Sequence, residues 1–223
     1  MVTSSFLIEY FLKLITSKQF VMKKFLLFFA ALALLSFTLN DITITKKEKK
    51  FATKFLKQTK EGVSEAIKGL SDAQLKYKPA ADKWGVEECL KHIAITEQML
   101  WGMLEANLKQ PATPDKRTEV KMTDEDVIKN IENRSTKVKT MDPAKPENTP
   151  FKSATDALTS FQESRDKLKS YVKNTEEDLR NHVVTMPFGS VDGYQFILFI
   201  SAHTNRHTQQ INEVKADPGF PKN

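Results

Sequence analysis

The segment Asp192–Lys215 constrains the fold more than any other part of this 223-residue chain. Its apolar residues recur at steps of three and four and are Phe196, Ile200, Ile211 and Val214. This spacing predicts an amphipathic helix with one buried face. Asp192 and Gln195 have the spacing of a capping box at its start, and Asp217-Pro218-Gly219 ends it.

Other stretches of the chain show the same helical periodicity. They are residues 46–70, 86–107, 123–141 and 153–174, with a short capped turn at 71–74. Prolines interrupt the chain between them, and residues 181–191 are expected to form a loop or a strand-like excursion. No long alternating run demands a sheet, so the predicted fold class is all-α, an antiparallel helical bundle with extra short helices.

Several apolar residues are assigned to the buried faces of these helices. They include Phe51 and Phe55 in the first helix, Met99, Trp101 and Met103 in the second, and Val127, Ile131 and Val138 in the third. The length of the chain suits one domain with a single well-filled core.

The charge of the chain gives no sign of nucleic-acid binding. The formal net charge is +6, from 34 basic and 28 acidic residues. Residues 1–40 contribute +3 of it, with four lysines against one glutamate, which leaves +3 for the remainder. No dense Lys/Arg cluster alternates with aromatic residues, so no nucleic-acid partner is expected.

The first forty residues are typical of a targeting segment. Met22-Lys23-Lys24 and the apolar run Phe25–Leu35 match the charged and apolar regions of a secretory signal. We expect an upstream extension at 1–21, a signal peptide at 22–40 and a domain at 46–221, with a periplasmic or secreted location. The alternative is an uncleaved membrane anchor, but the apolar run is shorter than the roughly 20 residues of a spanning helix. The single cysteine excludes an internal disulfide.

Three histidines form the candidate metal site. His203 and His207 are four residues apart on the apolar face of the last predicted helix, so both imidazoles should point inward. His92 lies on or beside the buried face of the second helix. Three protein ligands with open positions are typical of a catalytic site, where a divalent ion activates water or a substrate thiol. The alternative is three ordinary core histidines, and His182 is expected to be exposed.

Three further residues near these histidines have weaker functional signals. Cys89 could reach a metal but is better explained as a small buried hydrophobe. Arg206 could meet an anionic substrate, although a solvated or salt-bridged arginine is the usual outcome. Glu97 lies on a different face from His92 and could orient a ligand or cap another element.

Two motifs together resemble the DinB-like superfamily. They are Trp84-Gly85-Val86-Glu87-Glu88-Cys89-Leu90-Lys91-His92 and, after Asp192-Gly193-Tyr194-Gln195, His203-Thr204-Asn205-Arg206-His207. The resemblance covers residues 51–221 and implies a four-helix bundle that holds zinc, nickel or a similar ion on His92, His203 and His207. Its members include metal-dependent hydrolases and bacillithiol-transferase-like proteins. Gly85 stands where a serine or threonine cap is common in the family.

These observations favour an exported metal-dependent enzyme of hydrolase or transferase type. The ion on His92, His203 and His207 would activate water or a substrate nucleophile. The alternative is a non-catalytic bundle that binds metal or a small ligand as a sensor or carrier. Thiol transfer is cytosolic chemistry, which argues against a thiol cosubstrate for an exported chain. The expected partner is a small-molecule substrate, with a homodimer as one option for assembly and membrane contact only through an uncleaved signal segment.

Overall fold

The computed structural model describes residues 43–222. The predicted upstream extension at 1–21 and signal peptide at 22–40 therefore lie outside the described residues. Residues from Thr43 onward form one compact unit. Within this unit no helix is both long enough and apolar enough to cross a membrane.

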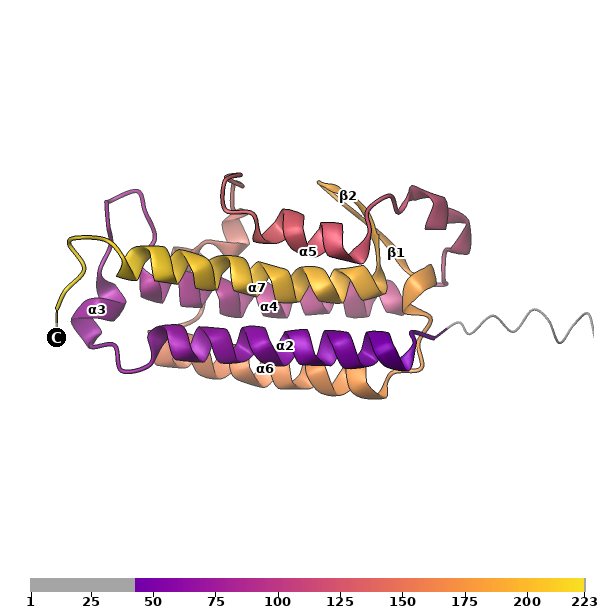
Figure 1. The fold of residues 1–223 in the computed structure, drawn as a ribbon, viewed down its shortest axis with the longest axis horizontal. Helices are drawn as coiled ribbons and strands as arrows, with labels where there is room; N and C mark the ends of the chain where they lie inside the picture. The colour runs from indigo at the N-terminus through magenta and orange to yellow at the C-terminus, as the bar shows by residue number, and fades with distance from the viewer. Residues whose placement is uncertain (1–42, 223) are drawn as a thin grey trace, which may run out of the picture. The chain divides into compact units, whose positions relative to one another are not determined.

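Four long helices build a bundle, which confirms the predicted fold class (Figure 1). They are α2 (Lys46–Ile67), α4 (Val86–Leu108), α6 (Ala154–Asn174) and α7 (Gly193–Lys215). Helix α2 packs against α6 and α7, and α4 packs against the same two helices. The bundle is antiparallel between α2 and α6 and between α4 and α7, whereas α2 runs parallel to α7 and α4 runs parallel to α6.

Short elements fill the connections between the long helices. They are α3 (Asp72–Lys76), η1 (Pro114–Glu119), α5 (Asp124–Glu132), η2 (Asp142–Ala144), η3 (Pro146–Asn148), η4 (Leu179–Asn181), β1 (Val183–Met186) and β2 (Gly189–Asp192). Because α4 and α6 are parallel, the chain must return along the bundle between them. Helix α5 lies on this return path and packs against α7 (Figure 1).

Local capping sets where the helices begin. The predicted capping box at the start of α7 is present, with the Asp192 carboxylate accepting from the backbone N–H of Gln195 at 2.8 Å. Gly85 caps α4 without a side chain, and a Cβ built there would lie 2.2 Å from the Tyr77 carbonyl oxygen. Glycine is therefore required at this cap by the close approach of another backbone segment.

Helix α5 is shorter than predicted. It ends at Glu132 instead of continuing to about Met141, and Val138 is 76 % exposed. The guanidinium of Arg206 donates to the carbonyl oxygens of Ile131, Asn133 and Thr136. These bonds satisfy carbonyls at the end of the helix, so the chain leaves the helical path there without leaving polar groups unpaired.

The segment before α7 forms a two-stranded antiparallel hairpin. Strands β1 and β2 pair with Met186 opposite Gly189, so Pro187 and Phe188 form a two-residue turn. Gly189 has a φ of +125°, which a side chain would strain. This result agrees with the strand-like excursion expected for the segment.

A polar layer divides the core of the bundle into two apolar clusters. One cluster includes Leu56, Leu100 and Leu168, and the other includes Val63, Ile93 and Phe161. On each of three helices, a polar residue lies in sequence between a residue of the first cluster and a residue of the second. These residues are Thr59 on α2, Glu97 on α4 and Arg165 on α6, and hydrogen bonds join them. We refer to Thr59, Glu97, Arg165 and Thr204 as the Arg165 layer.

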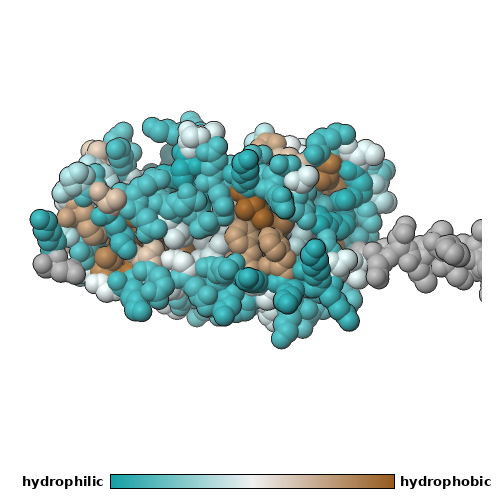
Figure 2. Space-filling model, viewed as in Figure 1, coloured by the Kyte–Doolittle hydropathy of each residue, from teal (hydrophilic) through white to brown (hydrophobic). Residues whose placement is uncertain are grey.

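The surface of the bundle carries a few large apolar side chains. The face shown in Figure 2 is mostly hydrophilic, with a hydrophobic patch to the right of its centre. Phe51 is 48 % exposed and Met103 is 43 % exposed, so the prediction that both are core residues is wrong. Phe51 instead packs on the ring of its helical neighbour Phe55, at 6.1 Å between ring centroids.

Candidate metal centre

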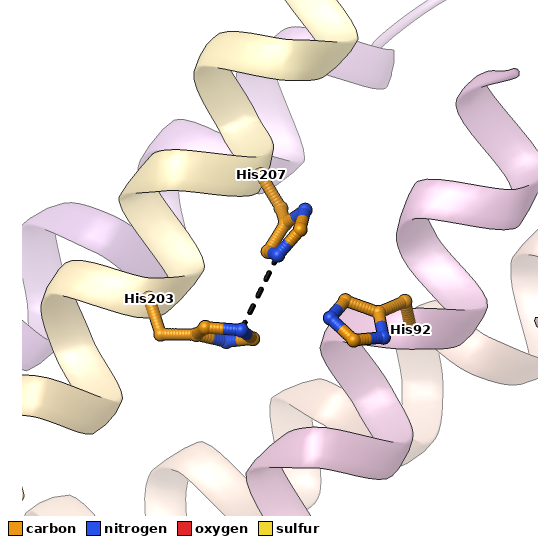
Figure 3. Close-up of side chains that lie close together, drawn as sticks. All are labelled: His92, His203 and His207. Carbon is orange, nitrogen blue, oxygen red and sulfur yellow. Dashed lines mark hydrogen bonds between the residues drawn. The ribbon is translucent and has the colours of Figure 1, made fainter. Parts of the chain in front are cut away.

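The structure brings His92, His203 and His207 together between α4 and α7. One ligand atom from each of the three rings lies within 4.8 Å of the others. The Nε2 atoms of His203 and His207 are 3.2 Å apart, and the His92 ring points toward them from the facing helix (Figure 3). His182 is not in this cluster, and at 6 % exposure it is buried, contrary to the prediction.

Helix register explains how distant residues converge here. His203 and His207 are one turn apart on α7, so their rings lie on one face and meet edge to face, with 4.6 Å between ring centroids. Helix α4 runs antiparallel to α7 and presents His92 to both, at 5.2 and 4.4 Å. The spacing that predicted inward-facing imidazoles on α7 is therefore sufficient to place two of the three rings.

Two hydrogen bonds orient the imidazoles. His92 donates from Nδ1 to the carbonyl oxygen of Ala144 at 2.7 Å, and His207 donates from Nδ1 to the side-chain oxygen of Gln210 at 2.9 Å. A neutral imidazole that donates from Nδ1 keeps a lone pair on Nε2. Both rings thus direct an electron pair toward the centre of the cluster, in the arrangement that outer partners impose on metal-bound histidines.

The Ala144 carbonyl was not foreseen from the sequence. Ala144 ends η2 and lies between Pro143 and Pro146 in the connection to α6. The sequence indicates only that residues 142–150 are rich in proline and extended. The contact with His92 joins residues 52 positions apart in the chain, which no local pattern encodes.

Burial keeps the three histidines neutral. Desolvation, together with the nearby His92 and two arginines, lowers the pKa of His203 to about 3. Burial also lowers the pKa of His92 and holds the pKa of His207 well below its ordinary value. Neutral imidazoles are the form that binds a metal ion.

The residues present fit a divalent ion. At Zn–N bond lengths of about 2.0–2.1 Å, two tetrahedral ligand nitrogens lie about 3.4 Å apart. The 3.2 Å between the His203 and His207 nitrogens is close to this value, and the whole set lies within 4.8 Å. His92, His203 and His207 would therefore hold the ion and leave coordination positions open.

Two aromatic rings flank the histidines, one from the segment before α4 and one from α7. Trp84 lies 4.8 Å from the His92 ring and 6.0 Å from the His207 ring, between centroids. On the other side, Phe199 lies 5.9 Å from the His203 ring. Apolar rings therefore contact each of the three histidines.

The weaker candidates take structural positions. Arg206 is buried and binds backbone carbonyls at the end of α5, so it is neither solvated nor salt-bridged as expected. Cys89 is buried as predicted, and burial raises the pKa of its thiol. Glu97 accepts two hydrogen bonds from Arg165, at 2.6 and 2.7 Å.

The sequence did contain a signal for Arg165. This residue follows Phe161 and precedes Leu168 at steps of four and three, on the face of α6 that also carries Val172. A charged residue inside an apolar stripe requires a buried partner. Glu97 on α4 is that partner, although the sequence alone does not pair the two.

Comparison with known proteins places the chain in a family. The model of the DinB superfamily matches residues 56–211. The chain belongs to the DinB superfamily. Among its relatives, the uncharacterised protein YuaE of Bacillus subtilis is 27 % identical over 150 residues, which cover 67 % of this chain and 88 % of YuaE.

A solved structure shows the same fold. YfiT from Bacillus subtilis, described as a probable metal-dependent hydrolase with an unusual four-helix bundle topology, matches with a TM-score of 0.54. The match covers 80 % of this chain and 92 % of YfiT at 15 % identity. It supports the bundle architecture of the DinB superfamily member described here.

Proposed function

We propose that the chain is a metal-dependent enzyme of hydrolase or transferase type. His92, His203 and His207 hold its divalent ion, which is zinc, nickel or a similar metal. The observation that carries the proposal is the pair of Nδ1 hydrogen bonds to Ala144 and Gln210, which leave the Nε2 atoms of His92 and His207 facing into a cluster whose ligand atoms lie within 4.8 Å of one another. The description of YfiT as a probable metal-dependent hydrolase supports the same reaction class.

The chain supplies a prepared environment for this chemistry. A bound divalent ion provides a Lewis acid that makes water or a substrate nucleophile reactive near neutral pH. The Ala144 carbonyl and the Gln210 amide fix the orientation of two ligands. Trp84 and Phe199 exclude water beside the rings, which strengthens electrostatic interactions at the site.

A non-catalytic metal- or ligand-binding bundle is the alternative, and one observation favours it. Glu97 is the buried carboxylate closest in the chain to His92, and both of its oxygens are bound by Arg165. It is therefore unavailable as a general base. Among residues 43–222 the only cluster suited to a metal contains histidines alone. A sensor or carrier would need no base, whereas an enzyme must draw on the substrate or on solvent for proton transfer.

A metal titration of single variants tests the site. We expect His92→Ala, His203→Ala and His207→Ala each to weaken Zn²⁺ and Ni²⁺ binding by more than about 100-fold in calorimetry, since each removes one of three ligands. His182→Ala is the matched control, because it removes a buried histidine outside the cluster. Binding that survives His92→Ala and is lost in His182→Ala would overturn the site.

An activity screen separates the enzyme from the sensor. The metal-loaded protein is assayed with ester, amide and thiol-transfer substrates. We expect turnover of at least one class that disappears in His203→Ala. Tight metal binding with no turnover in any class would favour the sensor or carrier.

We also propose that the protein is exported. The motivation is the sequence Met22-Lys23-Lys24 and the apolar run that follows it. Expressed from Met22 in a bacterial host, the protein should appear outside the cytoplasm, shortened by roughly 15–20 residues. Full-length protein in the membrane fraction would indicate an uncleaved anchor instead, and full-length protein confined to the cytosol would contradict export.

A further inference from the structure

A row of rings extends away from the histidine cluster. His207, His203 and Phe199 follow one another at four-residue steps on α7, and Phe199 lies 5.9 Å from the His203 ring. The ring of Phe188, from the hairpin turn, lies 5.3 Å from Phe199. Phe199 is only 7 % exposed, whereas Phe188 is 40 % exposed. The row therefore begins at the candidate metal ligands and ends at an accessible aromatic surface.

The hairpin holds Phe188 in a defined position. The two-residue turn is closed by pairing of Met186 with Gly189, and Gly189 adopts a positive φ that favours glycine. Ser190 also forms a bridge to Val120, which ties the hairpin to the segment after η1. An exposed phenylalanine held on a fixed turn is a preformed apolar surface and needs little ordering when a ligand covers it.

The opposite helix continues the same apolar character. Met99 and Met103 follow His92 by seven and eleven residues on α4, which places them on the same face of the helix as His92. Met103 is 43 % exposed. Exposed apolar side chains thus stand in line with the histidines on α4 and beside α7 on the hairpin.

Two arginines whose charges act on the cluster, Arg206 and Arg134, are already engaged. Arg206 donates to carbonyls at the end of α5, and Arg134 forms two hydrogen bonds to the Glu213 carboxylate, at 3.1 and 2.9 Å. Neither guanidinium is free to bind an anionic substituent. The exposed side chains identified in line with the histidines, Phe188 and Met103, are both apolar.

We propose that Phe199 and Phe188 form a specificity wall for an apolar, aryl-sized arm of the substrate. The reacting group of the substrate sits at His92, His203 and His207, and its arm lies on the exposed face of Phe188, which the buried ring of Phe199 supports from behind. The substrate class is thus a neutral compound with an aromatic or branched alkyl substituent. This inference rests on the proposed metal-dependent function and specifies its substrate.

Hydroxamates test the wall, because their head group binds metal and their arm can be varied. Calorimetry compares acetohydroxamate with 3-phenylpropanohydroxamate on the zinc-loaded full chain. We expect the phenyl compound to bind on the order of tenfold tighter, as for an arm that removes apolar surface from water. In Phe188→Ala, the ratio of the two hydroxamate affinities should fall close to the ratio measured for Zn²⁺ without protein. Phe188→Leu should keep most of the preference for the phenyl compound. Phe51→Ala is the control, since Phe51 is similarly exposed on α2 and should leave the ratio unchanged.

The outcomes separate the wall from the metal site. Acetohydroxamate binding without a preference for the phenyl arm would overturn the wall and leave the metal function standing. The wall would also be wrong if the Phe188→Ala protein, shown to be folded by a native circular-dichroism spectrum, kept the preference for the phenyl compound. If neither hydroxamate binds protein that is shown to contain zinc, the site is closed to ligands, and both the wall and the proposed function are wrong.

Discussion

The Arg165 layer and the histidine cluster are both buried polar groups, but they differ in how completely they are satisfied. Arg165 is 0 % exposed and has five N–H donors. They meet both oxygens of Glu97, the hydroxyls of Thr59 and Thr204, and the Leu56 carbonyl. The layer is internally complete and joins all four long helices.

In the histidine cluster, by contrast, fewer of the ring nitrogens have hydrogen-bond partners. His92 has one ring nitrogen engaged, by Ala144, and within residues 43–222 no protein hydrogen bond is made by its other nitrogen, which faces the rings across the cluster. His207 bonds Gln210 through Nδ1, and among the same residues its Nε2 has only the Nε2 of His203 as a partner, at 3.2 Å. A buried polar group without a partner costs stability, so such groups mark places where a ligand completes the structure. The comparison teaches that a saturated network holds the bundle together and an unsaturated one is suited to function.

Breaking the Arg165 layer should have the largest effect. Glu97→Ala leaves a buried guanidinium without its counter-charge, and we expect the free energy of unfolding to fall by about 3–5 kcal/mol. Urea denaturation followed by circular dichroism measures this. Glu61→Ala is the control, because Glu61 pairs with Lys57 on the exposed surface of α2 and should cost no more than about 1 kcal/mol.

A second variant sharpens the interpretation of the layer. Replacing both members, as Glu97→Leu with Arg165→Met, should recover most of the stability lost in Glu97→Ala, since an apolar pair can substitute for a buried ion pair. A double variant as unstable as the single one would show that the hydroxyl and carbonyl contacts of Arg165 matter more than its charge partner.

Removing metal should have the next largest effect. An ion present at about 100 times its Kd stabilises the folded state by about 2.7 kcal/mol, which corresponds to about 5–10 °C in Tm for a domain of this size. Chelation should lower the Tm of the zinc-loaded protein by that amount in scanning calorimetry. The variant His203→Ala should show no response, and a wild-type curve unchanged after verified removal of zinc would contradict the link between α4 and α7.

Loosening one ligand should have a smaller effect than losing it. Gln210→Leu removes the acceptor of the His207 Nδ1–H, and we expect Zn²⁺ affinity to fall by about 10–100-fold. The neighbouring Gln209→Leu is the control, because the Gln209 side chain instead bonds to the Glu132 carbonyl of α5. Equal losses in the two variants would show that the amide of Gln210 does not orient the ring.

The smallest expected change in stability, counted for one histidine and one pH unit, is the pH dependence of the metal-free protein. Burial lowers the pKa of His203 to about 3, below its ordinary value of 6.5, so the unfolded chain binds more protons between these values. Stability should be flat above pH 6.5 and fall below it, by about 1.4 kcal/mol per pH unit for each such histidine. Urea midpoints from pH 7.5 to 4.5 measure this, and His203→Ala should show a shallower fall. A wild-type profile that rises toward acid would contradict it.

Local chemistry in the sequence determined the long helices and two of the three histidine positions. Apolar steps of three and four and the cap at Asp192 define α7, and the spacing of His203 and His207 puts both rings on one face. These features depend on residues within one or two turns, so no knowledge of the rest of the chain is needed. The sequence also predicted correctly that His92 lies on the buried face of its helix, but it did not predict how close His92 lies to α7.

Tertiary contacts decided the remainder. The early end of α5 depends on Arg206, the orientation of His92 depends on Ala144, and the buried charge of Arg165 depends on Glu97, at separations of 70 or more, 52 and 68 residues. The burial of His182 likewise followed from packing that its local sequence does not show. Each is a hydrogen bond or a burial formed only after the helices pack. A buried polar group takes whichever partner the fold brings within about 3 Å, and periodicity along the chain carries no information about that partner.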